Sequence, residues 1–178
     1  MGRSPIVVMC VAAALLSLAW LPTAANAAQK VAIFPFDFVL PQSEEDFYIG
    51  PAPPTEAEKR RLGLAHGELK QLIAAGGRFE PVDLSGISAD IEAAAPIYRC
   101  NGCEVELAGK AGAELALTSV VDKVSETHLQ LNVSIVDVAK SKLVRNASVL
   151  IQGNTDEAWL HGVRWLVKNR LSGEESSK

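Results

Sequence analysis

Hydrophobic and polar positions along the chain follow two kinds of pattern. The run Lys30 to Val39 is β-branched and aromatic with little alternation, which favours a strand buried on both faces, and Pro35 predicts an irregularity within it. Apolar and polar residues alternate strictly from 128 to 136, which predicts an antiparallel strand with one face toward water. Further strands are expected at 79–84, 115–124 and 143–152.

Apolar residues at helical spacing predict four helices. The clearest begins at Thr55, which with Glu58 forms the sequence of a capping box, and ends at Gly76 and Gly77. The last helix, 156–171, begins after Asn154 or Thr155 as its cap. Its inner stripe would comprise Trp159, Val163, Leu166 and Val167. Two shorter helices are expected at 87–95 and 104–111.

The predicted elements follow the order β-α-β-α-α-β-β-β-α. The early βαβ unit implies two parallel strands, and the later run of three strands adds antiparallel pairs. We therefore expect one α/β (α+β) domain over residues 28–172, in which helices pack on a mixed five-stranded sheet. Residues 173–178 are polar, and we expect a disordered tail there.

Residues 1–27 have the pattern of a secretory signal peptide. Arg3 precedes the apolar run Ile6 to Leu21, and Ala25-Asn26-Ala27 has the small residues that signal peptidase recognises. An uncleaved anchor is the alternative, but the run is short for a membrane span. We therefore predict a periplasmic or secreted protein without a membrane span after cleavage.

The composition narrows the classes of function. The 178 residues carry a formal net charge of −4, and no stripe of lysine and arginine interleaves with aromatic residues, which disfavours nucleic-acid binding. Cleavage after residue 27 would remove Cys10 and leave Cys100 and Cys103. In an oxidising compartment this pair is expected to form a disulfide, with redox exchange and metal capture as the alternatives.

Several stretches resemble known envelope proteins. KVAIFPFDF, GRFEPVD and the segment from Gly112 to Val138 are similar to the domain shared by the curli secretion protein CsgG and the amino-terminal part of TolB. The stretches 100–104, 123–125 and 153–159 resemble a secreted bacterial family of unknown function. The resemblance implies the fold and the compartment, and it supplies no catalytic residue. The lipid-anchor cysteine and membrane-spanning hairpins of CsgG have no counterpart here, so pore formation is not expected.

No set of catalytic residues is recognisable in the chain. His66, His128 and His161 are scattered, and no phosphate-binding glycine motif occurs. We therefore expect no enzyme, no resident metal and no cofactor. A hydrolase remains an alternative, and it would require a cleft that holds one of these histidines beside a carboxylate.

The expected function is that of a non-enzymatic periplasmic accessory module that binds a partner protein or a small ligand. A long loop, 40–54, and the last helix would be its recognition surfaces. The candidate residues are Glu44, Glu45 and Asp46 on the loop and Trp159, His161, Arg164 and Trp165 on the helix. The alternative is a thiol-redox or metal-handling accessory protein that uses Cys100 and Cys103.

Overall fold

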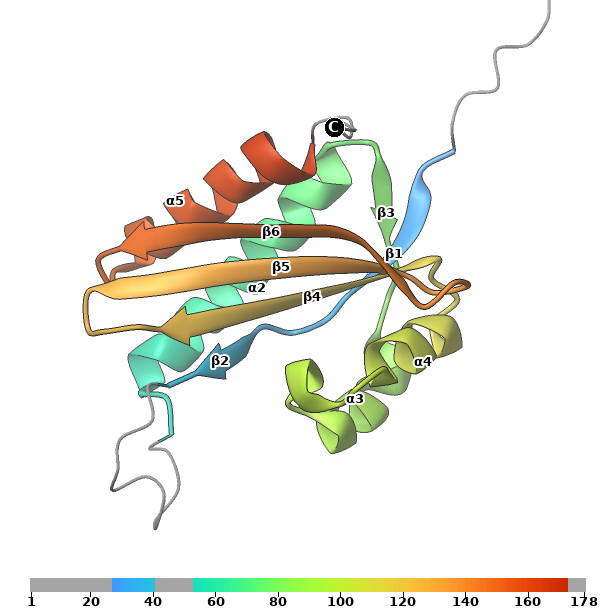
Figure 1. Cartoon of the computed structure of the whole chain (residues 1–178), viewed down its shortest axis with the longest axis horizontal. Coiled ribbons are helices and arrows are strands. Elements are labelled where there is room, and N and C mark those ends of the chain that lie inside the picture. The colour runs from blue at the N-terminus through green and yellow to red at the C-terminus, as the bar shows by residue number, and fades with distance from the viewer. Residues whose placement is uncertain (1–26, 41–52, 173–178) are drawn as a thin grey trace, which may run out of the picture.

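A computed structural model describes residues 27–40 and 53–172 (Figure 1). The strands are β1 (Gln29–Ile33), β2 (Asp37–Val39), β3 (Phe79–Pro81), β4 (Leu115–Lys123), β5 (His128–Asp137) and β6 (Lys142–Gln152). The α-helices are α2 (Glu56–Ala75), α3 (Ser88–Ala94), α4 (Cys103–Lys110) and α5 (Asp156–Leu166). Three short helical turns are η1 (Ser85–Ile87), η2 (Ile97–Arg99) and η3 (Val167–Leu171). The expected signal peptide, the acidic residues Glu44, Glu45 and Asp46, and the expected tail 173–178 lie outside the described residues.

The strands form one mixed sheet in the order β3-β1-β4-β5-β6. Strand β1 pairs in parallel with β3 and β4, whereas β4, β5 and β6 pair antiparallel. The predicted mixed sheet with packed helices is confirmed. The first predicted strand is divided, however, because Pro35 lies between β1 and β2 and proline cannot donate to a strand ladder. Both halves pair with β4, so the sheet has six strands in place of the expected five.

Helices cover the sheet on two sides, and each side has its own core. Helices α2 and α5 pack against one face with residues such as Leu69 and Trp159, and α3 and α4 pack against the other. Strand β1 contributes Val31 and Ile33 to the first core and Ala32 to the second, which confirms a strand buried on both faces. Figure 1 shows α2 and α5 together, apart from α3 and α4.

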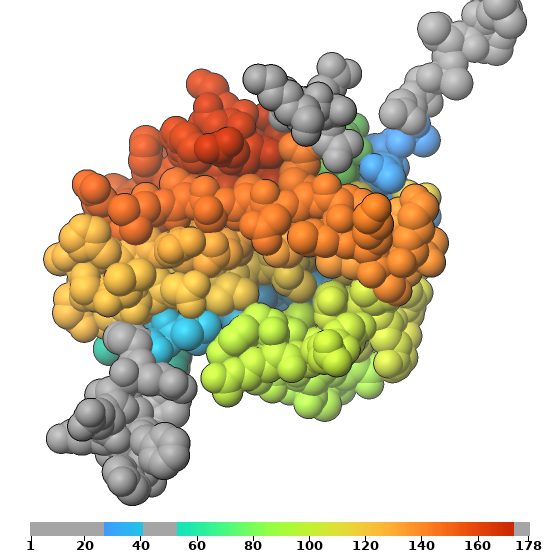
Figure 2. Space-filling view, in the orientation of Figure 1, coloured from blue at the N-terminus to red at the C-terminus, as the bar shows by residue number. Residues whose placement is uncertain are grey.

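Strands β5 and β6 leave part of the sheet open to solvent. In Figure 2 their yellow and orange surface forms a band across the middle of the view, with α5 above it and the yellow-green α3 and α4 below it. Leu129 and Leu131 of β5 are buried, whereas Gln130 between them is exposed, as the alternation predicts. Strand β6 lies at one edge of the sheet. None of the helices described is long and apolar enough to cross a membrane.

Candidate functional site

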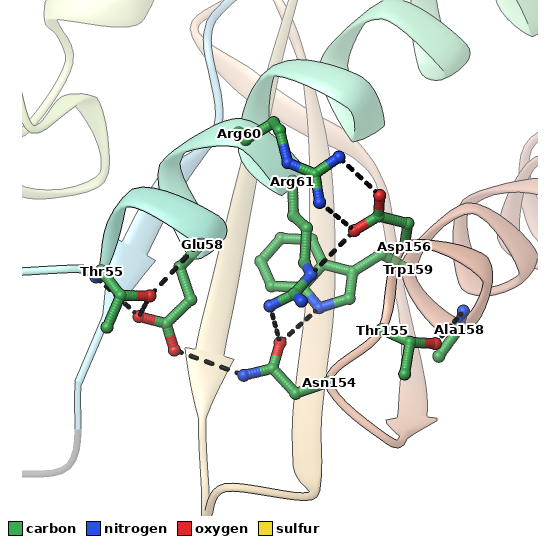
Figure 3. A network of polar contacts seen from close by, with 9 residues as sticks. All are labelled: Thr55, Glu58, Arg60, Arg61, Asn154, Thr155, Asp156, Ala158 and Trp159. Atoms are coloured by element: carbon green, nitrogen blue, oxygen red, sulfur yellow. Dashed lines mark hydrogen bonds and ion pairs between the residues drawn. The ribbon is translucent and has the colours of Figure 1, made fainter.

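The amino end of α2 carries a buried carboxylate, shown in Figure 3. The Thr55 hydroxyl accepts a hydrogen bond from the Glu58 amide at 3.2 Å, and Glu58 Oε2 accepts from the Thr55 amide at 2.8 Å. The predicted capping box is therefore confirmed. Unlike a typical capping carboxylate at a helix surface, Glu58 is only 2% exposed, so it needs partners for both oxygens.

Glu58 finds its further partners on two distant segments. Its Oε1 atom accepts hydrogen bonds from Lys123 Nζ at 2.8 Å and from Asn154 Nδ2 at 3.3 Å. Burial by itself raises the pKa of Glu58, but the hydrogen bonds from Lys123 and Thr55 outweigh burial and lower the pKa to about 2. The carboxylate is therefore ionised at neutral pH and joins α2 to the end of β4.

Asn154 extends this contact to α5. Its Oδ1 atom accepts from the Trp159 indole at 3.0 Å and from Arg61 at 3.1 Å (Figure 3). Arg61 also binds Asp156, and Arg60 adds two hydrogen bonds to that carboxylate at 2.7 and 2.9 Å. The hydrogen bond from Arg60 is the largest cause of a lowered pKa at Asp156.

The network contains two of the three stretches that resemble the family of unknown function, 123–125 and 153–159. Its charged groups are paired with one another, so it offers no free base or nucleophile. Thr155, whose hydroxyl accepts from the Ala158 amide at 3.2 Å, is the cap of α5, and this leaves the Asn154 side chain free to bridge. The network therefore serves to fix the position of α5.

A groove of about 620 Å³ lies between α5 and β6. Its lining residues include His161, Gly162 and Trp165 from α5 and Leu150 from β6. A Cβ atom at Gly162 would lie 2.7 Å from Ile151 Cγ1, so glycine is what allows the helix to approach the strand. Trp165 is 38% exposed and offers apolar surface on the α5 wall, whereas Leu150, 54% exposed, alternates with the inward-facing Ile151 and lies at the rim.

The structure separates the four candidate residues of the last helix. His161 and Trp165 line the groove. Trp159 is 1% exposed and belongs to the core, so the expectation that it forms part of a recognition surface is wrong: it lies on the inner stripe of α5 and stacks on Phe38. Arg164 turns toward α2, where its guanidinium donates to Glu68.

Cys100 and Cys103 lie just before and at the start of α4, away from the groove. They are joined as a disulfide in the structure, with Cα atoms 5.5 Å apart. The carboxylate of Glu104 accepts from the Gly102 amide at 3.1 Å and lies 3.6 Å from Cys100 Sγ. The ligand atoms of these two cysteines and Glu104 all lie within 4.8 Å of one another, but the two sulfur atoms are bonded to each other, so the three could bind a metal together only after reduction. The disulfide itself stays a prediction that a thiol measurement can test.

The three histidines lie in three different places. His66 lines a cavity that also contains Asp83 and Glu92, and its Nδ1 atom is buried without a hydrogen-bond partner among the described residues. His128 Nδ1 lies 3.3 Å from the Ser125 hydroxyl in an exposed turn. Within residues 27–40 and 53–172, no histidine forms hydrogen bonds with both a hydroxyl and a carboxylate. The cleft that a hydrolase needs is present at His66, but no triad is assembled in it.

Sequence patterns missed both the partners of Glu58 and the cavity at His66. The capping-box sequence revealed the first contact of Glu58, because that contact is local. Lys123 and Asn154 lie 65 and 96 residues away along the chain, and no periodicity relates them to the helix. The resemblance to the family of unknown function included the stretches 123–125 and 153–159, which contain Lys123 and Asn154, but it assigned them no role.

Comparisons with known proteins identify a family and a shared fold. Residues 29–171 match the family model DUF3280, which is described as "Protein of unknown function (DUF2380)". No curated protein matches the chain. The lipoprotein GNA1162 from Neisseria meningitidis is 14% identical at a TM-score of 0.52, over 83% of this chain and 99% of that chain, which shows a common fold.

Two further solved structures match at lower scores. The PelC dodecamer from Paraburkholderia phytofirmans is 12% identical at a TM-score of 0.49, over 85% of this chain and 93% of that chain. TolB from Acinetobacter baumannii is 14% identical at a TM-score of 0.42, over 82% of this chain and 30% of that chain. Likenesses of this size carry no functional argument, and the resemblance to CsgG stays a prediction.

Proposed function

Because the chain belongs to the DUF3280 family of proteins of unknown function, we propose its function from its own surfaces: it is a non-enzymatic accessory module of the bacterial envelope that binds an extended segment of a partner protein along β6. The observation that carries the proposal is the groove between α5 and the unpaired edge of the sheet, which polar and apolar residues line together.

The edge of β6 is suited to pairing with another strand. Lys142–Gln152 is an 11-residue strand, and none of the other described strands pairs with its outer side. An edge of this kind presents a row of backbone donors and acceptors, and an added strand gains affinity by pairing with them. The groove lies beside β6, so side chains of the added strand would enter it.

The groove determines which side chains the added strand would carry. Trp165 and Leu150 offer apolar surface, and a partly exposed tryptophan is a common anchor of protein interfaces. Glu157 also lines the groove, and its carboxylate favours a lysine or arginine nearby. The occupant is therefore an extended segment with an apolar side chain against Trp165 and a basic one toward Glu157.

Two observations support a setting in the bacterial envelope. Residues 1–27 have the pattern of a signal peptide, which predicts that the remainder is exported to the periplasm or out of the cell. The fold is shared with GNA1162, a lipoprotein. A role without catalysis agrees with the paired charges of the Glu58 network and with a His66 Nδ1 atom that has no hydrogen-bond partner among the described residues.

Site-specific photo-crosslinking in the native cells tests the proposal. The full chain carries a photoreactive residue at position 150, and the matched control carries it at Val124, which is 60% exposed but lies in the β4–β5 turn. We expect a crosslinked product with a different protein at position 150 only. Trp165→Ala is expected to reduce its yield by about fivefold or more, as for an interface anchor.

Three outcomes would contradict the proposal. These are no product at position 150, an equal product at position 124, and a product with the mass of two copies of this chain. The last outcome would show that β6 pairs with a second copy.

Glu104 favours one alternative function, that of a metal-handling protein. After reduction, the Cys100 and Cys103 thiols would join the Glu104 carboxylate in a set of three ligands. Calorimetry of the reduced chain with Zn²⁺ tests this function. It requires a one-to-one binding isotherm that disappears in Cys100→Ser; the absence of such an isotherm would eliminate it.

A further inference from the structure

A second candidate site lies at the carboxyl ends of the parallel strands β1 and β3. The chain leaves β1 toward α2 on one face of the sheet and leaves β3 toward α3 on the other face. Connections that depart to opposite faces from adjacent parallel strands leave a crevice between them, and ligands of open α/β sheets bind at such points. The topology therefore predicts a ligand site here, independently of the groove at β6.

A cavity of about 280 Å³ occupies this position. Its apolar lining comes from Ile33 and Pro35 at the end of β1 and from Leu84 and Ile91 after β3. Sites for drug-sized molecules span about 300–1,000 Å³, so a cavity just below that range suits a smaller molecule.

The walls of the cavity carry opposite charges. Lys70 comes from α2 and Glu92 from α3, so the two lie on opposite walls. Neither side chain forms an ion pair or a side-chain hydrogen bond within the described part of the chain, although the charge of Lys70 contributes to a lowered pKa at Asp83. Asp83 also lines the cavity, but its oxygens accept from the Ser85 amide at 3.0 Å and the Ser85 hydroxyl at 2.6 Å. Asp83 keeps its negative charge, but its oxygens already accept hydrogen bonds, so the ammonium group of Lys70 and the carboxylate of Glu92 are the charged groups left to hydrogen-bond a ligand.

We infer that this crevice binds a free amino acid with an apolar side chain. Lys70 would bind the carboxylate, Glu92 would bind the ammonium group, and the surface of Pro35 and Leu84 would contact the side chain. A simple anion would leave Glu92 unpaired, and a simple cation would leave Lys70 unpaired. A zwitterion satisfies both.

His66 adds a neutral ring to the lining of the crevice. Burial is the largest cause of a lowered pKa at His66, and the charge of Lys70 adds to it. The ring packs edge-on against Phe36 with centroids 6.1 Å apart. A neutral imidazole competes with neither the carboxylate nor the ammonium group of the ligand, so Lys70 and Glu92 determine the orientation.

Calorimetry with the secreted full chain tests the inference. The probes are L-valine, L-leucine, L-isoleucine, L-methionine and L-phenylalanine. Two matched analogues of leucine are 4-methylpentanoic acid, which lacks the ammonium group, and 3-methylbutylamine, which lacks the carboxylate. We expect at least one amino acid to bind. If leucine binds, each of its two analogues should bind at least about tenfold more weakly than leucine. If another of the amino acids binds, its own two analogues, made in the same way, should show the same loss.

Charge variants test the assigned residues. Lys70→Met and Glu92→Gln are each expected to weaken binding about tenfold or more, whereas Lys59→Met and Glu80→Gln, outside the crevice, are expected to leave it unchanged. The inference is overturned if none of the five amino acids binds up to millimolar concentration. Equal binding of an analogue, or loss of binding in the control variants as well, would also overturn it. These results do not depend on the crosslinking experiment at β6, so the inference and the proposed function can fail independently of each other.

Discussion

The buried pair of Glu58 and Lys123 gives a sharp test of how the fold is held together. Lys123→Met keeps a side chain of similar length and removes the cation that faces Glu58 Oε1 at 2.8 Å. The side chains of Lys123 and Glu58 are 9% and 3% exposed, so water cannot replace the lost partner. Removing one member of a buried pair costs about 3–5 kcal/mol of unfolding free energy.

The pKa of Glu58 gives an independent magnitude. The pKa falls from 4.5 to about 2 in the folded chain. At about 1.4 kcal/mol for each pKa unit, this corresponds to about 3 kcal/mol of stability at pH 7. A carboxyl whose pKa is lowered on folding stabilises the protein above its ordinary pKa and loses that contribution as the pH falls toward the folded value.

The effect of Lys123→Met must therefore depend on pH. If the pKa of Glu58 returns to its ordinary value in the variant, the loss of stability shrinks by about 2 kcal/mol between pH 7 and pH 3, because the wild-type chain then also loses its advantage. Urea unfolding curves of both proteins at several pH values measure this difference directly.

Lys59→Met is the matched control. Lys59 binds Glu56 at 2.8 Å on the same helix, but the two side chains are 52% and 89% exposed. Its replacement should cost less than about 0.5 kcal/mol at either pH. The reasoning fails if Lys123→Met costs no more than the control, or if its cost is the same at pH 7 and pH 3.

Two further predictions follow from close packing and from the cysteines. Gly162→Ala is expected to destabilise the protein by about 1–3 kcal/mol in urea unfolding, because the added Cβ would lie 2.7 Å from Ile151 Cγ1. Gly67→Ala is the control: the added Cβ would have no neighbour within 4 Å, so this substitution should stabilise the protein by about 0.5–1 kcal/mol. Equal effects of the two substitutions on the free energy of unfolding would contradict this prediction. Alkylation of the exported chain is expected to add two labels only after reduction, at Cys100 and Cys103; labelling without reductant would refute the disulfide.

Local patterns predicted most of the elements. The alternation from 128 to 136 identified β5 and its buried face, and the Thr55 capping box identified the start of α2. These features depend on neighbours within a few residues, so periodicity and capping chemistry suffice. The division of the first strand at Pro35 was expected only as an irregularity, because the length of the interruption depends on how β4 pairs with each half.

Such local patterns could not predict the candidate sites. Trp159 and Trp165 lie on the same helix, and helical spacing placed Trp159 on the inner stripe, which its burial confirms although it was also a candidate for the recognition surface; Trp165 is partly exposed. That Trp165 faces a groove, however, depends on how closely α5 approaches β6, which Gly162 allows. The cavity at His66 depends likewise on the connections of β1 and β3 to opposite faces, which the order of elements alone does not specify.

The paired network and the groove are physically linked. One side of α5 forms a wall of the groove. At the start of this helix, Asn154 and Asp156 bind side chains of α2. These contacts hold α5 in place before any partner arrives, and a wall that is already ordered reduces the entropy lost on binding. In the proposed function, the buried charges would position a binding surface. That arrangement explains how a chain can bury an ionised glutamate and yet display no catalytic motif.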